Sequence, residues 1–285
     1  MDCRVKPGND EMKQMIRFLI FPLAFALLLA TPAAARDTAR PYEPFLGQPG
    51  KDVVWVPTPD ALVEKMLDMA QVTPADFVID LGSGDGRTVI AAAKRGVRAL
   101  GVEYNDKMVE LARRRALEAG VAEHATFVQG DMFEADLSRA TVLALFLLEE
   151  NLDKLAPKFL DLKPGTRIVL NYFTVSGWTP DRTETIEEQC DTWCTAHLYV
   201  VPAKVQGVWQ LDGGTLTLGQ DFQRLRGSLA IGGKLLDLSA ARMEGEKIFF
   251  TADNAQYEGR VEGTTITGTF GAKREPWSAR WLRAN

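Results

Sequence analysis

The fold of this chain is decided by one stretch, Phe77-Val78-Ile79-Asp80-Leu81-Gly82-Ser83-Gly84-Asp85-Gly86-Arg87-Thr88-Val89-Ile90. It begins with a short apolar run of the kind that forms a buried parallel strand. Three glycines at alternate positions follow, and helix-forming residues resume at Thr88. The sequence therefore predicts a strand, a tight glycine turn and a helix. Glycine permits both the sharp turn and the close approach of a ligand, and the unpaired N–H groups that open the helix face the same place. We expect a nucleotide-like ligand there.

The spacing of the glycines indicates which ligand this is. In the dinucleotide fingerprint G-x-G-x-x-G, a pyrophosphate rests on the helix N-terminus, but here the third glycine, Gly86, comes one place early. An anionic pyrophosphate gains nothing from the carboxylates of Asp80 and Asp85, whereas a ligand with an ammonium group and a sulfonium charge does. For the glycine loop taken alone, a βα turn without any ligand is the alternative.

The stretch resembles motif I of the class I S-adenosylmethionine (SAM) methyltransferases, D-x-G-x-G-x-G. This resemblance implies SAM as the cofactor and a Rossmann-like α/β fold. It also implies that the cofactor-binding residues include the five motif positions Asp80, Gly82, Ser83, Gly84 and Gly86.

The rest of the first 200 residues alternates between strand and helix patterns. Strands are expected at residues 77–81, 97–103, 125–129, 141–147 and 167–172. Helices are expected from Thr58 as N-cap, after the glycine loop, between Asn105 and Gly120, and around Leu152, Leu155 and Phe159. Such alternation is typical of a doubly wound parallel sheet. Residues 183–186 and 197–201 are candidates for antiparallel edge strands.

The ends of the predicted strands supply further candidate ligands, because an open parallel sheet binds ligands past the carboxyl ends of its strands. Glu103 ends the second strand, about twenty residues after the glycine loop, where its carboxylate can accept from both ribose hydroxyls. Asp131 follows the third strand and can accept from an adenine amino group, and Met132 lies beside it to flank the ring. Each acid alone could equally be a solvated loop residue or a helix cap.

Further motifs extend the resemblance over about residues 52–201. They are Val56-Pro57-Thr58-Pro59, Leu147-Leu148-x-Glu150-x-Asn151, Leu162-Lys163-Pro164-Gly165-Thr166 and Trp178-Thr179-Pro180-Asp181. Together with motif I they look like bacterial relatives of the FAM173-type and, more distantly, the Dot1-like protein-lysine N-methyltransferases. The resemblance implies N-methylation of a protein lysine or another amine. The absence of Asn-Pro-Pro-Tyr after residues 141–147 argues against the adenine and glutamine N-methyltransferases.

Candidate catalytic residues follow the fourth and fifth strands. Methyl transfer depends mostly on positioning, but a lysine with a pKa of about 10.4 must first lose a proton. Glu150 and Asn151 after the fourth strand, and Asn171 and Tyr172 at the end of the fifth, are the groups expected near the acceptor. For Glu150 and Asn151, capping of the next helix is the alternative role.

The N-terminal residues 1–35 have the pattern of an export signal. Lys13 and Arg17 precede or open an apolar run at residues 16–30, and Ala33-Ala34-Ala35 forms an A-x-A cleavage site. We expect a cleaved signal peptide, with an uncleaved membrane anchor as the alternative, and hence a periplasmic or envelope-associated protein. Residues 36–57 form an extended, proline-rich lead-in, and residues 58–203 the SAM-binding domain.

Beyond about residue 204 the pattern changes to short strands separated by Gly, Asp and Asn turns. Residues 204–285 are expected to form a small all-β domain, a barrel or a sandwich. Cys190 and Cys194, four apart, either pair or remain free, and His124 and His197 have no metal-ligand spacing.

Composition limits the classes of function that remain. The chain has 285 residues, 46% hydrophobic and 25% charged, and a net charge of −5, so a broad nucleic-acid interface is not expected. Two rivals to the methyltransferase remain: an NAD-type oxidoreductase on a similar sheet, and a non-catalytic binding protein of the cell envelope that kept the fold. The sequence does not identify the methyl acceptor.

Overall fold

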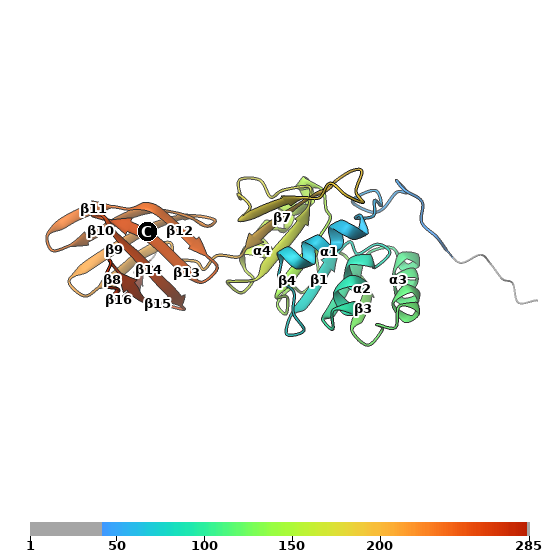
Figure 1. Cartoon of the computed structure of the whole chain (residues 1–285), viewed down its shortest axis with the longest axis horizontal. Coiled ribbons are helices and arrows are strands. Elements are labelled where there is room, and N and C mark those ends of the chain that lie inside the picture. Colours follow the sequence, from blue (N-terminus) through green and yellow to red (C-terminus); the bar gives the residue numbers. More distant parts are fainter. Residues whose placement is uncertain (1–41, 284–285) are drawn as a thin grey trace, which may run out of the picture. The chain divides into compact units, whose positions relative to one another are not determined.

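The computed structural model describes residues 42–283 and contains two β-sheets (Figure 1). The first has seven strands in the order β3-β2-β1-β4-β5-β7-β6. Its strands are β1 (Phe77–Leu81), β2 (Arg98–Glu103), β3 (Ala125–Gln129), β4 (Val142–Leu145), β5 (Arg167–Asn171), β6 (Arg182–Thr185) and β7 (Thr195–Val200). The first five are parallel and the last two antiparallel. The α/β prediction is therefore confirmed. Both candidate antiparallel strands are present, but only β6 lies at the edge, because β7 pairs with β5 as well as with β6.

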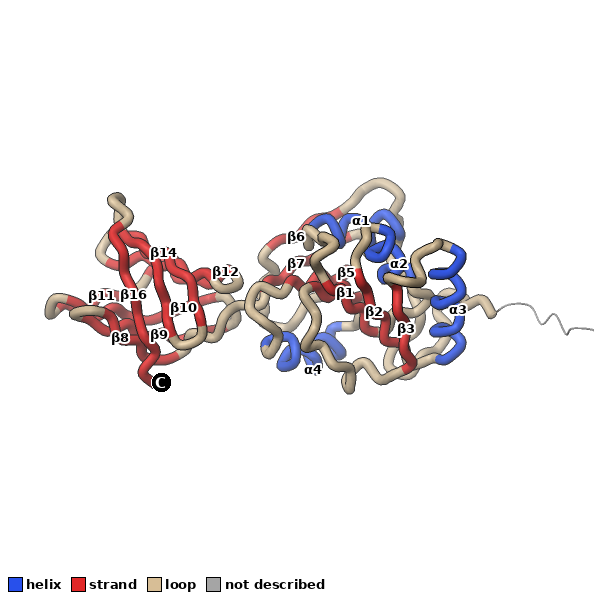
Figure 2. The backbone as a smooth tube through the Cα atoms, turned by 90° about the horizontal axis from the view of Figure 1, so that it is seen from below, coloured by secondary structure: helices blue, strands red, loops and turns tan. Residues whose placement is uncertain are grey.

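Helices cover both faces of this sheet (Figure 2). The helices are α1 (Asp60–Met69), α2 (Arg87–Lys94), α3 (Asp106–Glu118) and α4 (Glu149–Leu160). On one face α1, α2 and α3 pack on Val78, Ala144 and Val169. On the other, α4 packs on Leu81 and Leu143. Alternate residues of each buried strand thus enter different cores, which explains why these strands are apolar throughout.

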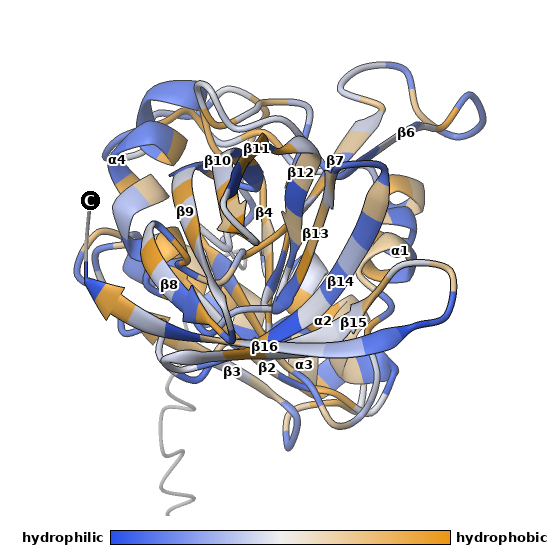
Figure 3. Cartoon of the chain, turned by 90° about the vertical axis from the view of Figure 1, so that its left-hand side faces the viewer, coloured by the Kyte–Doolittle hydropathy of each residue, from blue (hydrophilic) through white to orange (hydrophobic). Residues whose placement is uncertain are grey.

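The second sheet forms a barrel-like ring. Its strands are β8 (Gly207–Leu211), β9 (Gly214–Asp221), β10 (Arg224–Ile231), β11 (Lys234–Asp237), β12 (Ser239–Glu244), β13 (Lys247–Ala252), β14 (Ala255–Glu262), β15 (Thr265–Phe270) and β16 (Glu275–Arg283). Eight of them close on themselves because β10 pairs with both β9 and β12, and β11 is added beside β10. Hydrophobic and hydrophilic residues alternate along strands such as β8 and β9 (Figure 3). The inward set, which includes Trp209, Leu216 and Ile266, forms a core of its own.

The structure corrects one local prediction and leaves another outside its range. Thr58 was expected to cap α1, but the cap position is Pro59, which provides no side-chain hydrogen bond. Thr58 instead lies buried, and its carbonyl oxygen accepts a hydrogen bond from Arg87 at 2.9 Å. The expected signal peptide at residues 1–35 falls outside the described residues. Within residues 42–283, no helix is long and apolar enough to cross a membrane.

Candidate active site

The glycine loop between β1 and α2 has the backbone that its sequence predicts. Gly82, Gly84 and Gly86 have φ angles of 69°, 52° and 83°, in the left-handed region that favours glycine. The three glycines have different neighbours. A Cβ on Gly86 would lie 2.7 Å from Ala112 and 2.8 Å from Phe127, whereas one on Gly84 would lie 2.7 Å from the indole nitrogen of Trp55. Gly86 therefore allows α2 and α3 to pack closely, and Gly84 allows the segment before α1 to approach the loop.

Glu103, at the end of β2, connects the loop to the neighbouring strand. One oxygen of its carboxylate accepts the N–H of Gly84 at 2.9 Å, and the other accepts the N–H of Asn105 at 2.9 Å. Each oxygen keeps a free lone-pair direction, because an ionised carboxylate accepts about four hydrogen bonds. Glu103 is thus held rigidly at the edge of the pocket, with capacity left for a pair of hydroxyl donors.

Asp80 lies beneath the loop and does not line the pocket. Burial raises the pKa of this carboxyl well above its usual range, and the negative charges of Glu103 and Asp85 add to the effect, while a hydrogen bond from Thr88 opposes it. The side chain is therefore poised to stay protonated where an exposed aspartate would be ionised.

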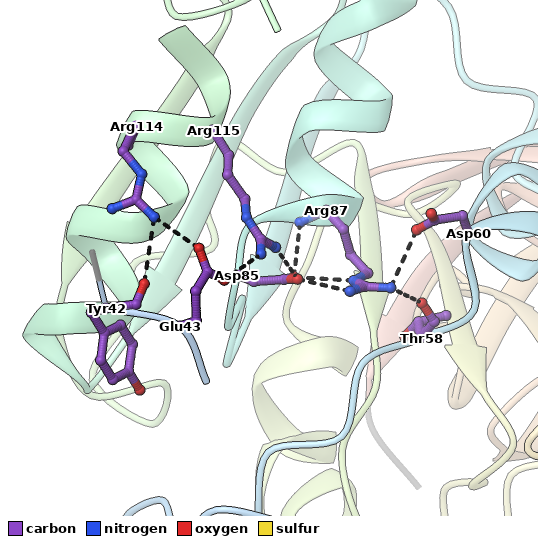
Figure 4. Close-up of polar contacts among 8 residues, drawn as sticks. All are labelled: Tyr42, Glu43, Thr58, Asp60, Asp85, Arg87, Arg114 and Arg115. Atoms are coloured by element: carbon purple, nitrogen blue, oxygen red, sulfur yellow. Dashed lines mark hydrogen bonds and ion pairs between the residues drawn. The ribbon is translucent and has the colours of Figure 1, made fainter. Parts of the chain in front are cut away.

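Asp85 has a different partner from the one the sequence suggested. Its carboxylate, which we expected near a cationic ligand, pairs with Arg87 at 2.8 Å and also with Arg115 (Figure 4). Although burial acts against ionisation, these two guanidinium groups hold the pKa of Asp85 below its usual range. Glu43 and Asp60 extend the network at either end, so it fixes the loop, α3 and the lead-in together and leaves no charge for a ligand.

The pocket opens beside the loop, and the lead-in forms one of its walls. It encloses about 720 Å³, including its open mouth. Four of the predicted cofactor residues line it: Gly82, Glu103, Asp131 and Met132. The opposite wall is residues 48–56, which we call the strap; it is held by two backbone hydrogen bonds of Trp55, to Gly47 and Gln48, at 2.9 Å each.

A second contact holds the strap on the pocket rim. Lys51 forms an ion pair with Asp131, whose other oxygen accepts the N–H of Phe133 at 2.8 Å. The hydrogen bond from Lys51 is the main cause that lowers the pKa of Asp131. The Lys51 ammonium also lies 4.8 Å from the centre of the Tyr104 ring. The proposed role of Asp131 toward an adenine amino group stays a prediction, and no sequence pattern indicated that a lysine would share this carboxylate.

The predicted catalytic residues lie at the ends of β4 and β5 and differ in burial. Glu150 is exposed in the first turn of α4, and Tyr172 is 49% exposed. Asn151 and Asn171 are buried, and each has one amide atom without a partner among the described residues: Nδ2 of Asn151 and Oδ1 of Asn171. Buried polar atoms without partners are rare and call for an explanation. A ligand that completes the site would supply one.

The pocket also meets a direct test for a nucleoside ligand. The Ser83 hydroxyl, although buried without a hydrogen-bond partner among residues 42–283, lies against Gly101 and does not line this pocket. The pocket itself presents Glu103 with free acceptor capacity, and the apolar side chains of Met108, Met132 and Leu147 line it as well. Hydroxyl-accepting, polar and apolar groups thus occur together, as the ribose, amino-acid and adenine parts of SAM require.

Sequence reasoning missed several residues of the site. The strap, Tyr104, Met108 and Phe146 all line the pocket, but only the proline-rich composition and Trp55 marked the strap as unusual. Cys190 and Cys194, for which two states were open, form a disulfide with Cα atoms 5.7 Å apart. No cluster that could hold a metal ion occurs within residues 42–283.

Comparison with known proteins gives a consistent result. Residues 80–182 match the model of the ANTKMT methyltransferase domain. A protein-lysine N-methyltransferase from Saccharolobus islandicus is 42% identical over 152 residues, which cover 52% of this chain and 94% of that protein. The adenine nucleotide translocase lysine N-methyltransferase of Mus musculus is 32% identical over 155 residues, which cover 54% of this chain and 63% of that protein.

A solved structure matches the same half of the chain. It is described as an RNA methyltransferase from Salinibacter ruber in complex with S-adenosyl-L-homocysteine. The two are 43% identical with a TM-score of 0.50, over 53% of this chain and 96% of that chain. These three relatives are all named methyltransferases, and their names differ on the acceptor.

Proposed function

Because the chain belongs to the family of SAM-dependent methyltransferases that includes the Saccharolobus protein-lysine N-methyltransferase, we propose that it methylates the ε-amino group of lysine in a protein. The observation that carries the proposal is the 42% identity over nearly the whole archaeal enzyme. The glycine loop and Glu103, at the ends of adjacent strands, support the same function.

The chemistry asks for little covalent help from the protein. SAM supplies an electrophilic methyl on a sulfonium sulfur. The lone pair of the amine forms the new C–N bond as the C–S bond breaks, and one proton leaves the nitrogen. The protein therefore has to hold the amine in line with the methyl group and exclude water. Asn171, Asn151 and Tyr172 at the ends of β4 and β5 are the candidates to position the amine, and Glu150 is the candidate to receive its proton.

An RNA acceptor is the alternative, because the Salinibacter relative bears that description. The net charge of −5 speaks against it, since binding to the phosphate backbone depends on clustered Lys and Arg. A cationic, lysine-bearing acceptor suits an acidic protein better.

One labelling experiment separates the two acceptors. The purified enzyme is incubated with radioactive-methyl SAM and an extract of the native host. One portion of the labelled product is then treated with protease and another with ribonuclease. We expect protease to release the label and ribonuclease to leave it. Label that only ribonuclease releases would replace lysine by RNA as the acceptor. SAM binding in calorimetry without any transfer would leave a SAM-binding protein that is not an enzyme.

We also propose that the N-terminal segment directs the enzyme to the cell envelope. The proposal rests on the charged, apolar and A-x-A pattern of residues 13–35. Cleavage after Ala35 gives a mature protein that begins at Arg36. Peptide mapping of the protein from its native host tests this, and recovery of intact residues 20–35 would contradict cleavage.

A further inference from the structure

Four aromatic side chains form a continuous surface next to the pocket. We call Phe146, Tyr172, Phe173 and Trp193 the aromatic wall. The Phe146 ring lies 6.2 Å from that of Phe173 and 5.9 Å from that of Trp193, and Tyr172 meets Phe173 edge to face at 5.3 Å. Phe146 also lines the cofactor pocket. The wall therefore begins in that pocket and continues past the ends of β4 and β5 to the loop before β7.

The backbone under Tyr172 is strained. The N–H of Phe173 donates to the carbonyl oxygen of Asn171 at 2.7 Å, and Tyr172 between them has a φ of 63°. This is a γ-turn with a left-handed central residue, a rare and strained form. Strain of this kind persists where the surroundings enforce it, and it gathers at functional sites.

Contacts from β7 enforce this turn. The N–H of Tyr172 donates to the carbonyl of Thr195 at 2.7 Å, and Nε2 of His197 lies 3.0 Å from the carbonyl oxygen of Tyr172. Thr183 holds the other nitrogen of that ring at 2.9 Å. The result is that the Tyr172 side chain is held 49% exposed, edge to face against Phe173.

A disulfide holds the far end of the wall. Trp193 lies within the five-residue loop that Cys190 and Cys194 close. A short closed loop has few conformations, so the bond restrains the position of Trp193 against Phe146.

The charges around the wall favour a cation. Glu187, Glu188 and Asp191, in the loop between β6 and β7, are exposed, and none of them forms an ion pair within the described part of the chain. Glu149 and Glu150 open α4 a few residues after Phe146. Aromatic faces attract ammonium groups through their quadrupole, and the surrounding carboxylates raise the local concentration of cations.

From these observations we propose that the aromatic wall binds the alkylammonium side chain of the methyl acceptor, and that the Cys190–Cys194 disulfide holds Trp193 in the binding position. The inference rests on the proposed function, because it assigns the acceptor site of that reaction. A lysine side chain arrives protonated at neutral pH, with a pKa of about 10.4, so the wall receives it first as an ammonium ion.

The first test uses Trp193→Ala in the full, oxidised chain, with poly-L-lysine and SAM as substrates. We expect KM for poly-L-lysine to rise about 5- to 30-fold, the range of a desolvated cation–π contact. Turnover at saturation and the Kd for SAM should change less than twofold. Trp193→Phe should recover most of the loss, and Trp281→Ala, at an exposed tryptophan of the barrel, should have no effect. An unchanged KM, or a fall in kcat alone, overturns the proposal.

A second test asks whether the wall recognises charge or only apolar surface. Choline and 3,3-dimethylbutan-1-ol have the same shape, and only choline carries a positive charge. We expect choline to compete with poly-L-lysine at millimolar concentration and to shift the indole NMR signal of Trp193 in the wild-type chain. The competition should be at least fivefold weaker in Trp193→Ala. Equal effects of the two compounds would refute an ammonium site.

A third test addresses the disulfide. The double variant Cys190→Ser, Cys194→Ser should raise KM for poly-L-lysine in the same direction as Trp193→Ala. When it is combined with Trp193→Ala, KM for poly-L-lysine should rise by less than a further twofold, because both changes act through one contact. Additive effects would separate the disulfide from the wall. If the wild-type chain transfers no methyl group to any amine, the proposed function fails, and the choline titration still decides the inference.

Discussion

The carboxyl edge of the seven-stranded sheet has two halves with opposite character. At the ends of β1, β2 and β3, the cofactor half, carboxylates are already paired: Glu103 with two backbone N–H groups, Asp131 with Lys51, and Asp85 with two arginines. At the ends of β4, β5 and β7, the acceptor half, buried amides of Asn151 and Asn171 have atoms without a partner among the described residues, and Tyr172 is strained. The carboxylates of the cofactor half are thus paired before any ligand binds, although the Ser83 hydroxyl there has no partner among the described residues. In the acceptor half it is the amides of two buried asparagines that are left incomplete.

This difference separates two ways of building a site. A preorganised half binds its ligand with little loss of conformational freedom, which suits a cofactor shared by every turnover. An unsatisfied, strained half costs stability that only a bound partner can recover. Changes to the cofactor half should therefore reduce stability or affinity for the cofactor, and changes to the acceptor half should weaken acceptor binding or turnover while sparing the fold.

The largest effect is expected from Gly86→Ala in the cofactor half. The new Cβ would lie 2.7 Å from Ala112 and 2.8 Å from Phe127, at a φ of 83°. Overpacking and left-handed strain together should cost about 3–5 kcal/mol of folding stability. Scanning calorimetry can measure this loss of stability on the unfolding transition whose midpoint temperature rises when SAM binds. Gly213→Ala is the control, because its new Cβ would have nothing within 4 Å at a φ of 68°. It introduces the left-handed strain without overpacking and should cost about 1–2 kcal/mol of folding stability. Equal losses in the two variants would show that close packing at Gly86 is unimportant.

Glu103→Ala should have the next largest effect, on affinity for SAM. In the proposed role of Glu103, the change removes charge-assisted hydrogen bonds to the ribose hydroxyls, each worth about 1.5–3 kcal/mol. It also frees the N–H of Gly84. Partial replacement by water leaves a net loss of about 2–3 kcal/mol, or roughly 30- to 150-fold in Kd. Calorimetric titration of the folded variant measures it, with Glu103→Gln as the matched control that keeps one acceptor. A Kd within threefold of the wild type would make Glu103 a structural residue only.

Asp80 gives the cofactor half a pH dependence with a predictable sign. Its pKa in the folded protein lies well above the 3.8 of the unfolded chain, so between these values the native state keeps a proton that the unfolded state has lost. The stability that Asp80 contributes is therefore full below pH 3.8 and declines as pH rises through the native pKa. Asp80→Asn cannot titrate, so its stability relative to the wild type should rise as the pH increases above about 4 in thermal melts.

Asp85→Asn is the control with the opposite sign. The native pKa of Asp85 is lowered, so its contribution is present above the unfolded value of 3.8 and declines as pH falls through the native pKa. The stability that Asp85→Asn loses relative to the wild type should therefore become smaller as the pH falls. Parallel slopes for the two variants would mean that Asp80 is ionised in the native protein.

Sequence reasoning predicted where the glycine loop, Glu103 and Asp131 lie in the fold, because that information is local or topological. The glycine loop is contiguous, and Glu103 and Asp131 follow from the rule that parallel strands end at one edge. It failed for contacts that join distant residues. Asp85 was interpreted as a charge near the ligand, but Arg115, thirty residues later, neutralises it. The contact of Trp55 with Gly84 and that of Trp193 with Phe146 leave no periodicity or spacing that a sequence could show.

The acceptor half shows the same limit in another form. Asn171 and Tyr172 were chosen from their place after the fifth strand, which is correct as topology. The strain at Tyr172 depends on β7, because Thr195 and His197 form the hydrogen bonds that hold the Tyr172 backbone. His197 looked like an ordinary histidine because its role depends on a partner 25 residues earlier.

Asn171→Leu tests whether the acceptor half is incomplete. Asn171 is fully buried with Oδ1 unpaired among the described residues, and its Nδ2 has one long contact to Thr58 at 3.4 Å. A leucine has the same branched heavy-atom skeleton and removes the unpaired oxygen, so stability should rise by about 1 kcal/mol while methyl transfer to poly-L-lysine falls. Thermal melts and initial rates measure the two effects, with Asn151→Leu as the parallel case. A loss of stability above about 1 kcal/mol would show Asn171 to be a structural residue, and the contrast between the halves would lose its basis here.

The smallest effect is expected from Lys51→Ala, which releases the strap from the cofactor half. The ion pair of Lys51 with Asp131 is exposed, and exposed pairs contribute little to equilibrium stability. The strap nevertheless forms a wall of the pocket, so its opening should limit how fast the ligand enters and leaves. Association and dissociation rates of SAM should both rise, by up to about fivefold, while Kd changes less. Stopped-flow fluorescence, with Trp55 as the reporter in the strap, can follow both rates. Lys234→Ala, at an exposed pair with Asp253 in the barrel, should change neither. If Kd falls clearly while the association rate stays fixed, Lys51 competes with the ligand for Asp131, and the cofactor half is less complete than its paired carboxylates suggest.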